Sequence, residues 1–135
     1  MASSSLFHEF DGLLSLGFVE KTPGWLLASR FFSSKVGGKP AWLDLKNLPT
    51  SEETSCQKCG NPLAFLLQVY AYLDIDPNCY HRVIFIFMCN DSRCHQTQDS
   101  PPFKVFRSQL RQENEYYPYE DPIETPDWNT ELNVG

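Results

Sequence analysis

Side-chain character repeats with a period of two through residues 63–73, which is typical of a β-strand whose successive side chains point to opposite faces. Residues 83–88 form a second run that is almost wholly apolar and rich in β-branched and aromatic residues. Between them, residues 74–78 contain the Asp, Pro and Asn residues that favour turns. The pattern therefore predicts an antiparallel hairpin. One face of its first strand is expected to carry Leu63, Phe65, Leu67, Val69, Ala71 and Leu73.

Weaker patterns surround this hairpin. Short strands are expected at residues 16–20, 25–28 and 103–107, with a turn at Pro23-Gly24 between the first two. Gly37-Gly38 is interpreted as a sharp turn rather than a phosphate-binding loop, because its surroundings do not match G-x4-G-K-[ST].

The chain is expected to form one domain. Its 135 residues, 41% of them hydrophobic, are enough to bury a single core. We place a zinc-stabilised β domain at residues 16–111, after a tail or short helix at residues 1–15. Residues 112–135 carry seven acids, three prolines and no Lys or Arg, and are expected to be an acidic tail or a linker. The predicted fold is mainly β: a partly closed antiparallel barrel or sandwich with little helix.

Four cysteines flank the predicted hairpin. Cys56 and Cys59 directly precede its first strand, while Cys89 and Cys94 directly follow its second. Because the outer ends of a hairpin meet, both pairs should lie together, as in a zinc ribbon. Four thiolates suit one Zn²⁺, and a shell closed by four protein ligands is typical of a structural site. The predicted zinc ligands are therefore Cys56, Cys59, Cys89 and Cys94.

Other uses of these cysteines remain open from the sequence. They could be unrelated core thiols or form two disulfides, and the C-x2-C pair could be a redox site, although no helix pattern follows it. His95 could replace Cys94 as a ligand. Cys79 is interpreted as a small buried or turn residue, because adjacent strand positions point apart and a contact between Cys79 and His81 would be strained.

Charge and cysteine content limit the cellular compartments and the classes of binding partner that are expected. The formal net charge of −6 disfavours nucleic acid as the main partner, because phosphate binding depends on clustered Lys and Arg. Lys104, Arg107 and Arg111 are either a solvated edge, the commoner use of such charges, or a contact for phosphate or an acidic peptide. The N-terminal residues lack a secretory pattern, and the apolar runs are too short to cross a membrane. An odd number of cysteines with metal-type spacing indicates a reducing compartment, the cytosol or nucleus.

Several strings of residues resemble one known family. They include Lys-Val-Gly-Gly-Lys-Pro-Ala-Trp at residues 35–42, Cys56-x2-Cys59-Gly60, and Leu-Leu-Gln-Val-Tyr-Ala at residues 66–71. From about Leu16 to Tyr119 the chain resembles the N-terminal part of the programmed cell death protein 2 family. The resemblance implies an intracellular β-rich module that escorts a newly made small-subunit ribosomal protein of the S5 family into the 40S precursor. Such a protein is a chaperone and not an enzyme.

The expected client surface follows from this resemblance. Acidic charge would complement a basic ribosomal protein, and buried aromatic anchors would supply affinity. We expect a monomer in cytoplasm and nucleus, with the client surface lined or supported by Trp25, Phe31, Phe32 and Trp42. The alternatives are a zinc ribbon that contacts RNA in pre-ribosomes and a C-x2-C thiol-redox protein.

The chain departs from the family pattern in two places. Members of the family continue into further cysteine-containing regions, in one branch a MYND-type finger, so we expect a fragment or a short form. The family string Gln-Leu-Pro-Arg-x-Asn occurs here as Gln-Leu-Arg-Gln-Glu-Asn at residues 109–114, without the proline. The loop after the last strand is therefore expected to differ in shape.

Overall fold

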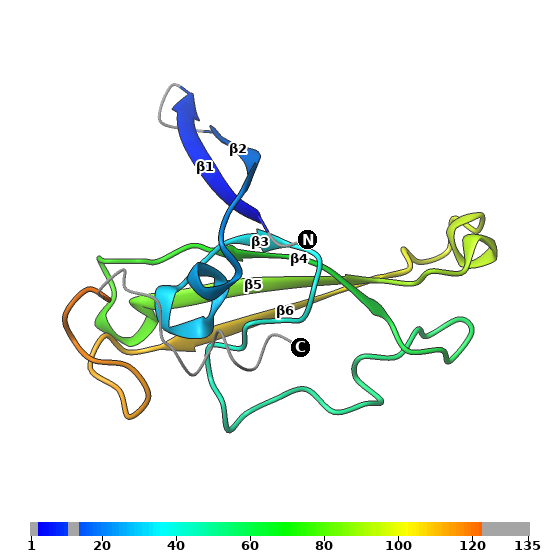
Figure 1. Ribbon diagram of the computed structural model, residues 1–135. Coiled ribbons are helices and arrows are strands. Elements are labelled where there is room, and N and C mark those ends of the chain that lie inside the picture. Colours follow the sequence, from blue (N-terminus) through cyan, green and yellow to red (C-terminus); the bar gives the residue numbers. More distant parts are fainter. Residues whose placement is uncertain (1–2, 11–13, 123–135) are drawn as a thin grey trace.

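The computed structural model describes residues 3–10 and 14–122, which form two antiparallel sheets (Figure 1). A two-stranded sheet pairs β1 (Ser3–Phe10) with β2 (Leu14–Lys21). A four-stranded sheet has the order β3-β4-β5-β6, formed by β3 (Lys35–Val36), β4 (Ala64–Tyr70), β5 (His81–Met88) and β6 (Phe103–Leu110). In the described part of the chain, the helical segments are single 3-10 turns: η1 (Gly24–Leu27), η2 (Ser29–Phe31), η3 (Pro77–Cys79) and η4 (Ser92–His95).

The predicted central hairpin is present, but the predicted closure is wrong. β4 and β5 pair antiparallel where the two apolar runs were identified, and the strands expected at residues 16–20 and 103–107 correspond to β2 and β6. The larger sheet is open: β3 has two residues and, among the described strands, pairs with β4 alone, so it does not close the sheet onto β6. A loop, rather than a second sheet, covers the core.

Two local expectations differ from the structure. Of residues 25–28, expected as a strand, residues 25–27 lie in η1 and Ala28 caps it, because the turn at Pro23 continues into a helical turn in which Leu26 N–H donates to Pro23 O at 3.1 Å. Residues 3–10 form β1 rather than a tail or short helix. The double-glycine turn is present, since Gly37 and Gly38 have φ angles of 71° and 74°.

A β-bulge at Leu66 changes which residues of β4 share a face. Phe65 pairs with Phe87 but Leu67 pairs with Ile86, so Leu66 is an extra residue. The Leu66 carbonyl accepts a hydrogen bond from Gly37 N–H at 2.8 Å. The predicted strict alternation is therefore wrong at this point. Residues Phe65, Gln68 and Tyr70 share the core side of the sheet, and Leu67 and Val69 share the opposite side.

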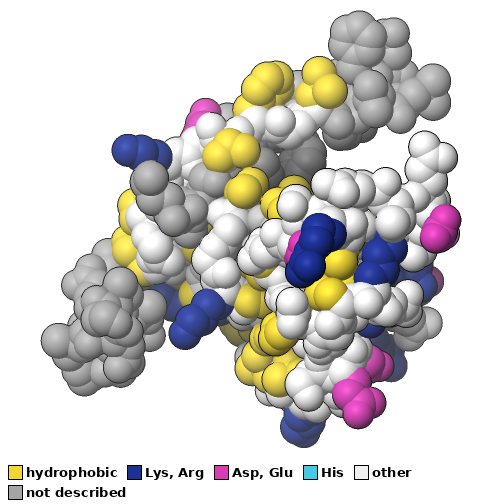
Figure 2. Space-filling view, turned by 90° about the vertical axis from the view of Figure 1, so that its right-hand side faces the viewer, with side chains coloured by type: hydrophobic (Ala, Val, Ile, Leu, Met, Phe, Trp, Pro, Cys, Tyr) yellow, Lys and Arg dark blue, Asp and Glu magenta, His cyan; other side chains and the backbone are white. Residues whose placement is uncertain are grey.

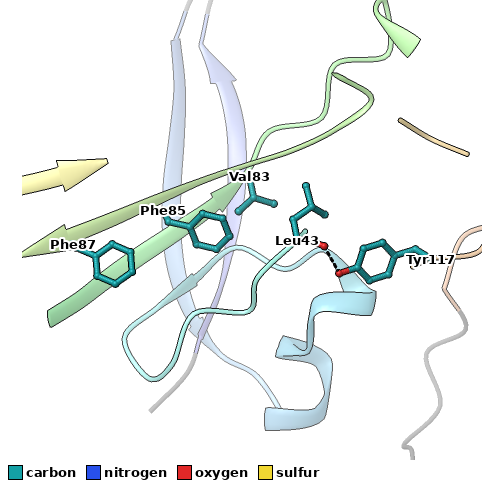
Figure 3. Packing of buried hydrophobic residues seen from close by; sticks show 5 residues of the cluster. All are labelled: Leu43, Val83, Phe85, Phe87 and Tyr117. Atoms are coloured by element: carbon teal, nitrogen blue, oxygen red, sulfur yellow. Dashed lines mark hydrogen bonds between the residues drawn. The ribbon is translucent and has the colours of Figure 1, made fainter. Parts of the chain in front are cut away.

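The core lies on one side of the sheet, beneath β5. Burial along β5 alternates, with His81, Val83, Phe85 and Phe87 buried. The loop between β3 and β4 brings Leu43 across this face, and Tyr117 reaches it from beyond β6 (Figure 3). These loop residues replace the second layer that a sandwich would have supplied.

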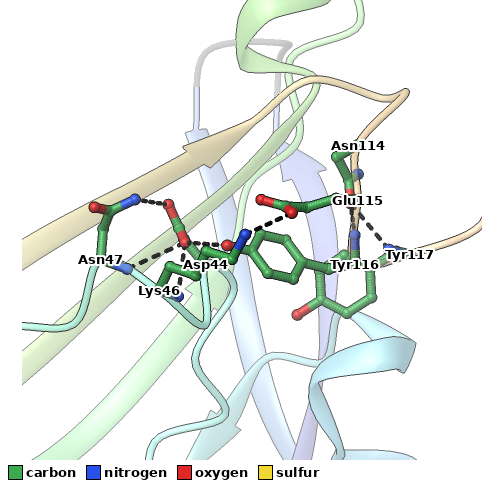
Figure 4. Close-up of polar contacts among 7 residues, drawn as sticks. All are labelled: Asp44, Lys46, Asn47, Asn114, Glu115, Tyr116 and Tyr117. Atoms are coloured by element: carbon green, nitrogen blue, oxygen red, sulfur yellow. Dashed lines mark hydrogen bonds and ion pairs between the residues drawn. The ribbon is translucent and has the colours of Figure 1, made fainter.

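The segment after β6 is attached to this loop by polar contacts (Figure 4). Asn114 Oδ1 accepts hydrogen bonds from the N–H groups of Tyr116 and Tyr117, both at 2.9 Å. The Tyr116 hydroxyl donates to Asp44 at 3.0 Å, and the Tyr117 hydroxyl donates to Leu43 O at 2.7 Å. Residues up to Tyr117 therefore pack with the domain, although residue 112 was the expected start of an acidic tail; residues 123–135 of that tail, including Trp128, lie outside the described residues.

The other side of the sheet is apolar and only partly covered. On this side Ile84 and Ile86 are half-buried, while Val105 is 61% exposed. Hydrophobic side chains of β2 are also exposed, including Phe18 and Val19. Over the described residues, no helix is long and apolar enough to cross a membrane.

Candidate metal centre

The four predicted ligands meet at one end of the larger sheet, the right-hand end in Figure 1. Their sulfurs all lie within 4.8 Å of one another. Cys56 Sγ lies 3.9 Å from Cys94 Sγ, and Cys59 Sγ lies 3.7 Å from Cys89 Sγ. A tetrahedral zinc centre with bonds of about 2.3 Å places its sulfurs about 3.8 Å apart. The cluster therefore has the size and donor set of a site for one metal ion such as zinc.

The first pair of cysteines lies in a tight turn before β4. Cys56 O accepts from Gly60 N–H at 2.8 Å, and Gly60 has a φ of 74° that favours glycine. Lys58 N–H points back to Cys56 Sγ at 3.4 Å. The Lys58 ammonium crosses to the other pair, where it donates to Cys94 O at 2.9 Å.

The second pair has a matching arrangement after β5. Asp91 N–H points to Cys89 Sγ at 3.4 Å, the same i+2 relation as in the first turn. The Asp91 carboxylate caps η4 by accepting from Arg93 N–H at 3.0 Å, and it also pairs with the Arg93 guanidinium at 2.7 Å. This turn directs Cys94 inward, leaving it 6% exposed.

His95 does not belong to the cluster. Its Nε2 atom lies 2.6 Å from Cys89 O, and its ring meets Phe103 edge-on at 5.7 Å. The sequence left open whether His95 replaces Cys94, and the geometry favours Cys94 because its sulfur faces the other three.

The environment does not ionise the four thiols equally. Backbone N–H groups of Cys59 and Lys58 lower the pKa of the Cys56 thiol to about 6. Burial, together with the neighbouring thiols, raises the pKa of Cys94 to about 12. A cluster of four thiolates therefore requires a cation, because close negative charges oppose one another's ionisation. Lys and Arg side chains are exposed on this end of the molecule (Figure 2) and partly offset the charge of such a cluster.

The alternative uses of the cysteines fit less well. All five are free thiols, and the sulfur separations are far longer than the disulfide bond length of about 2.05 Å. A redox pair at Cys56 and Cys59 would not require the other two sulfurs beside it. Cys79 lies in η3, outside the cluster.

Comparison with known proteins identifies the family of this domain. Residues 13–124 match the programmed cell death protein 2, N-terminal domain. The chain belongs to the programmed cell death protein 2 family. It is 47% identical to mouse programmed cell death protein 2 over 120 residues and 46% identical to the bovine protein over 126 residues, which are 89% and 93% of this chain. It is also 40% identical to human programmed cell death protein 2-like over 80 residues, 59% of this chain. No solved structure matches it.

The chain spans about a third of the length of the curated programmed cell death protein 2 relatives that it matches. The aligned part is 34% of the mouse protein and 35% of the bovine protein, and 21% of the human programmed cell death protein 2-like protein. What this chain shares with them is therefore an N-terminal domain.

The four aromatic residues that were predicted to bind a partner do not line one common pocket. Trp42 packs against Phe85, with ring centroids 4.7 Å apart, and lines a recess beside β6. Phe31 and Phe32 line a different pocket at the opposite end of the sheet from the cysteines, and Trp25 meets Phe31 edge-on at 5.6 Å. Their role in partner binding remains a prediction.

The other residues of that second pocket were not predicted from the sequence. Tyr70 ends β4 and Tyr72 follows it, whereas Tyr80 directly precedes His81, the first residue of β5. A signal was available, because residues on both sides of a hairpin turn are brought together. The turn concentrates aromatic rings at the end of the sheet remote from the metal centre.

Proposed function

We propose that this family member is a non-catalytic binding module that holds a newly made small-subunit ribosomal protein of the S5 family during assembly of the 40S subunit. The observation that carries the proposal is the match of residues 13–124 to the N-terminal domain of the family. The net charge of −6 supports it, because ribosomal proteins carry basic segments that need a complementary surface before they meet RNA.

In this proposal the metal centre has a structural role. Zn²⁺ held by Cys56, Cys59, Cys89 and Cys94 would fix the two turns that begin and end the central hairpin. Four protein ligands leave no coordination position for an activated water, so we assign no reaction to the site. We further propose that the protein acts as a monomer in cytoplasm and nucleus.

Direct RNA binding is the competing function. The basic residues that could contact phosphate do not lie together on one surface. Lys104 and Arg107 are three positions apart in β6 and therefore point to opposite sides of the sheet. Lys104 Nζ also donates to Glu53 O at 2.8 Å. Arg111 lies beyond the end of the strand. No common basic stripe supports phosphate binding by these three residues.

The test is affinity purification of the tagged chain from dividing cells, read by quantitative mass spectrometry. The proposal expects one small-subunit ribosomal protein, of the S5 family, to be enriched above all other ribosomal proteins. A matched control is an unrelated domain of equal size and net charge. Equal enrichment of many basic ribosomal proteins on both baits would reject a dedicated client, and salt-sensitive recovery of ribosomal RNA would favour the competing function.

A further inference from the structure

The pocket at the end of the sheet remote from the metal centre has an aromatic wall and an acidic rim; we call it the aromatic pocket. It has a volume of about 310 Å³. Its lining includes the rings of Phe32, Tyr70, Tyr72 and Tyr80, together with Glu120 and Asp121 from the segment that follows Tyr117. β5 separates it from the cysteines by its whole length, about 25 Å for eight residues.

The rings form a continuous wall. Phe32 stacks on Tyr70 at 5.2 Å between centroids, Tyr70 on Tyr72 at 6.1 Å, and Tyr72 lies 6.3 Å from Tyr80. Tyr72 is 58% exposed, so part of this wall is open to solvent. The wall offers π-faces, which carry negative electrostatic potential.

The wall is held in place from behind. The Phe32 ring also stacks on His81 at 4.2 Å, and Tyr70 Oη lies 2.8 Å from His81 Nδ1. Phe32 has a φ of 51°, a conformation rare for a bulky residue, which the surrounding packing must maintain. A preorganised ring wall loses little conformational entropy when a ligand binds.

Charge in the aromatic pocket favours a cation. Among the described residues that line it, Glu120 and Asp121 are the charged ones, and none is Lys or Arg. Burial lowers the pKa of His81, so this side chain is neutral at pH 7. Burial first, and then the neighbouring Tyr80, Tyr72 and Asp121, raise the pKa of Tyr70. Negative ring faces beside two carboxylates attract positive charge.

A guanidinium fits this combination better than an ammonium does. The guanidinium is planar, stacks on aromatic faces and pairs with carboxylates through two hydrogen bonds, whereas an ammonium is a compact, strongly hydrated charge. The protein already contains one such contact at this end: Arg30 Cζ lies 4.3 Å from the centroid of Phe31, which also lines the aromatic pocket.

We propose that the aromatic pocket binds an arginine side chain of a polypeptide partner, stacked on the tyrosine wall and paired with Asp121 or Glu120. This inference rests on the proposed function, because it assigns a recognition site for a basic client. It adds the chemical group that is recognised and the place where it binds.

The direct test is an NMR titration of the 135-residue, zinc-loaded chain with acetyl-Ala-Arg-Ala-amide. The matched peptide contains citrulline, which has nearly the same shape as arginine but no charge. We expect the arginine peptide to bind about tenfold more tightly and to shift the ring signals of Tyr72, Tyr80 and His81. Equal binding of the two peptides, or shifts confined to other parts of the protein, would overturn the proposal. A lysine peptide that binds as tightly as the arginine peptide would overturn the choice of guanidinium.

Two exposed positions allow the pocket to be altered without loss of the fold. Tyr72→Leu keeps an apolar side chain but removes a π-face, and is expected to lower the affinity for the arginine peptide about three- to tenfold. Asp121→Asn removes one charge from the rim and is expected to lower the affinity for the arginine peptide about threefold. The control is Glu113→Gln, which changes the same charge at an exposed residue outside the pocket and should bind like the parent chain.

The two proposals can fail separately. If the arginine peptide binds but no ribosomal protein co-purifies, the aromatic pocket stands and the proposed function falls. If the client co-purifies equally with the parent chain and with Tyr72→Leu, and the two peptides bind alike, the proposed function stands and the arginine site is rejected.

Discussion

The side chain of Gln68 holds the backbone of Ala41, a residue 27 positions earlier in the chain. Ala41 N–H donates to Gln68 Oε1 at 2.8 Å, and Gln68 Nε2 donates to Ser33 O at 3.0 Å. Gln68 is only 2% exposed, so these bonds replace water inside the domain. One amide thereby connects β4 to both ends of the glycine-containing loop.

Replacing this amide should be costly. We expect Gln68→Met, which nearly conserves volume, to reduce the free energy of unfolding by about 2–4 kcal/mol, because Ala41 N–H and Ser33 C=O lose their buried partner. Urea denaturation of the zinc-loaded chain measures the change. The control is Gln57→Met, the same substitution at an exposed residue of the first cysteine turn, which should change stability little. Equal stability of both variants would show that water can satisfy the freed groups.

Removal of a single ligand should release the metal. We expect Cys89→Ser to bind far less than one zinc per chain and to unfold at least the cysteine end of the sheet. Structural zinc contributes about 10–16 kcal/mol of apparent binding free energy, comparable with the whole stability of a domain. Elemental analysis and circular dichroism measure the two effects. Cys79→Ser is the matched control and should retain one zinc; equal metal content in both variants would contradict the assignment.

Acidification should destabilise the protein through His81. Burial lowers the pKa of this imidazole below its usual value of about 6.5, so the unfolded chain binds the proton more readily than the folded chain. The stabilisation is present above pH 6.5 and is lost as the pH falls through and below that value. A histidine ring titration by NMR between pH 7.5 and 6, with zinc in excess, should give a midpoint for His81 below 6.5. A midpoint at or above 6.5 would mean that the charged ring is accommodated.

Two adjacent tyrosines should respond differently to loss of the hydroxyl. Tyr117→Phe is expected to cost about 1–2 kcal/mol, because the buried carbonyl of Leu43 loses its donor. Tyr116→Phe should cost less, since the Asp44 carboxylate keeps its bonds from Lys46 N–H and from Asn47 (Figure 4). Thermal denaturation of both variants provides the comparison. A larger loss for Tyr116→Phe would show that the segment after β6 is held mainly by its outer contacts.

The features that the sequence predicted are those determined by local pattern and by chain order. The apolar runs on either side of residues 74–78 favour a hairpin by themselves, and the order of the two cysteine pairs around it then requires the sulfurs to meet. The four-cysteine cluster could therefore be located from the sequence alone.

The features that it did not predict depend on tertiary contacts. The face on which Phe65 lies depends on one extra residue at Leu66, which no periodicity reveals. Residues 25–28 have a strand-like composition, but no strand in the described part of the chain pairs with them, and residues 25–27 lie in a helical turn instead. Tyr117 belongs to the core although the residues around it are acidic, because its ring fills space that only the folded loop creates.

The bulge in β4 also determines where this strand can change its length. Deleting Leu66 would leave Phe65 opposite Phe87 and Leu67 opposite Ile86, so the ladder would become regular and no side chain would exchange faces. Deleting a residue elsewhere in the strand would turn part of it inside out. Deleting Leu66 would instead remove one hydrogen bond, because Gly37 N–H would lose the Leu66 carbonyl that accepts it. Natural length variation in this strand should accordingly be confined to that single position, and should be accompanied by changes in the double-glycine turn.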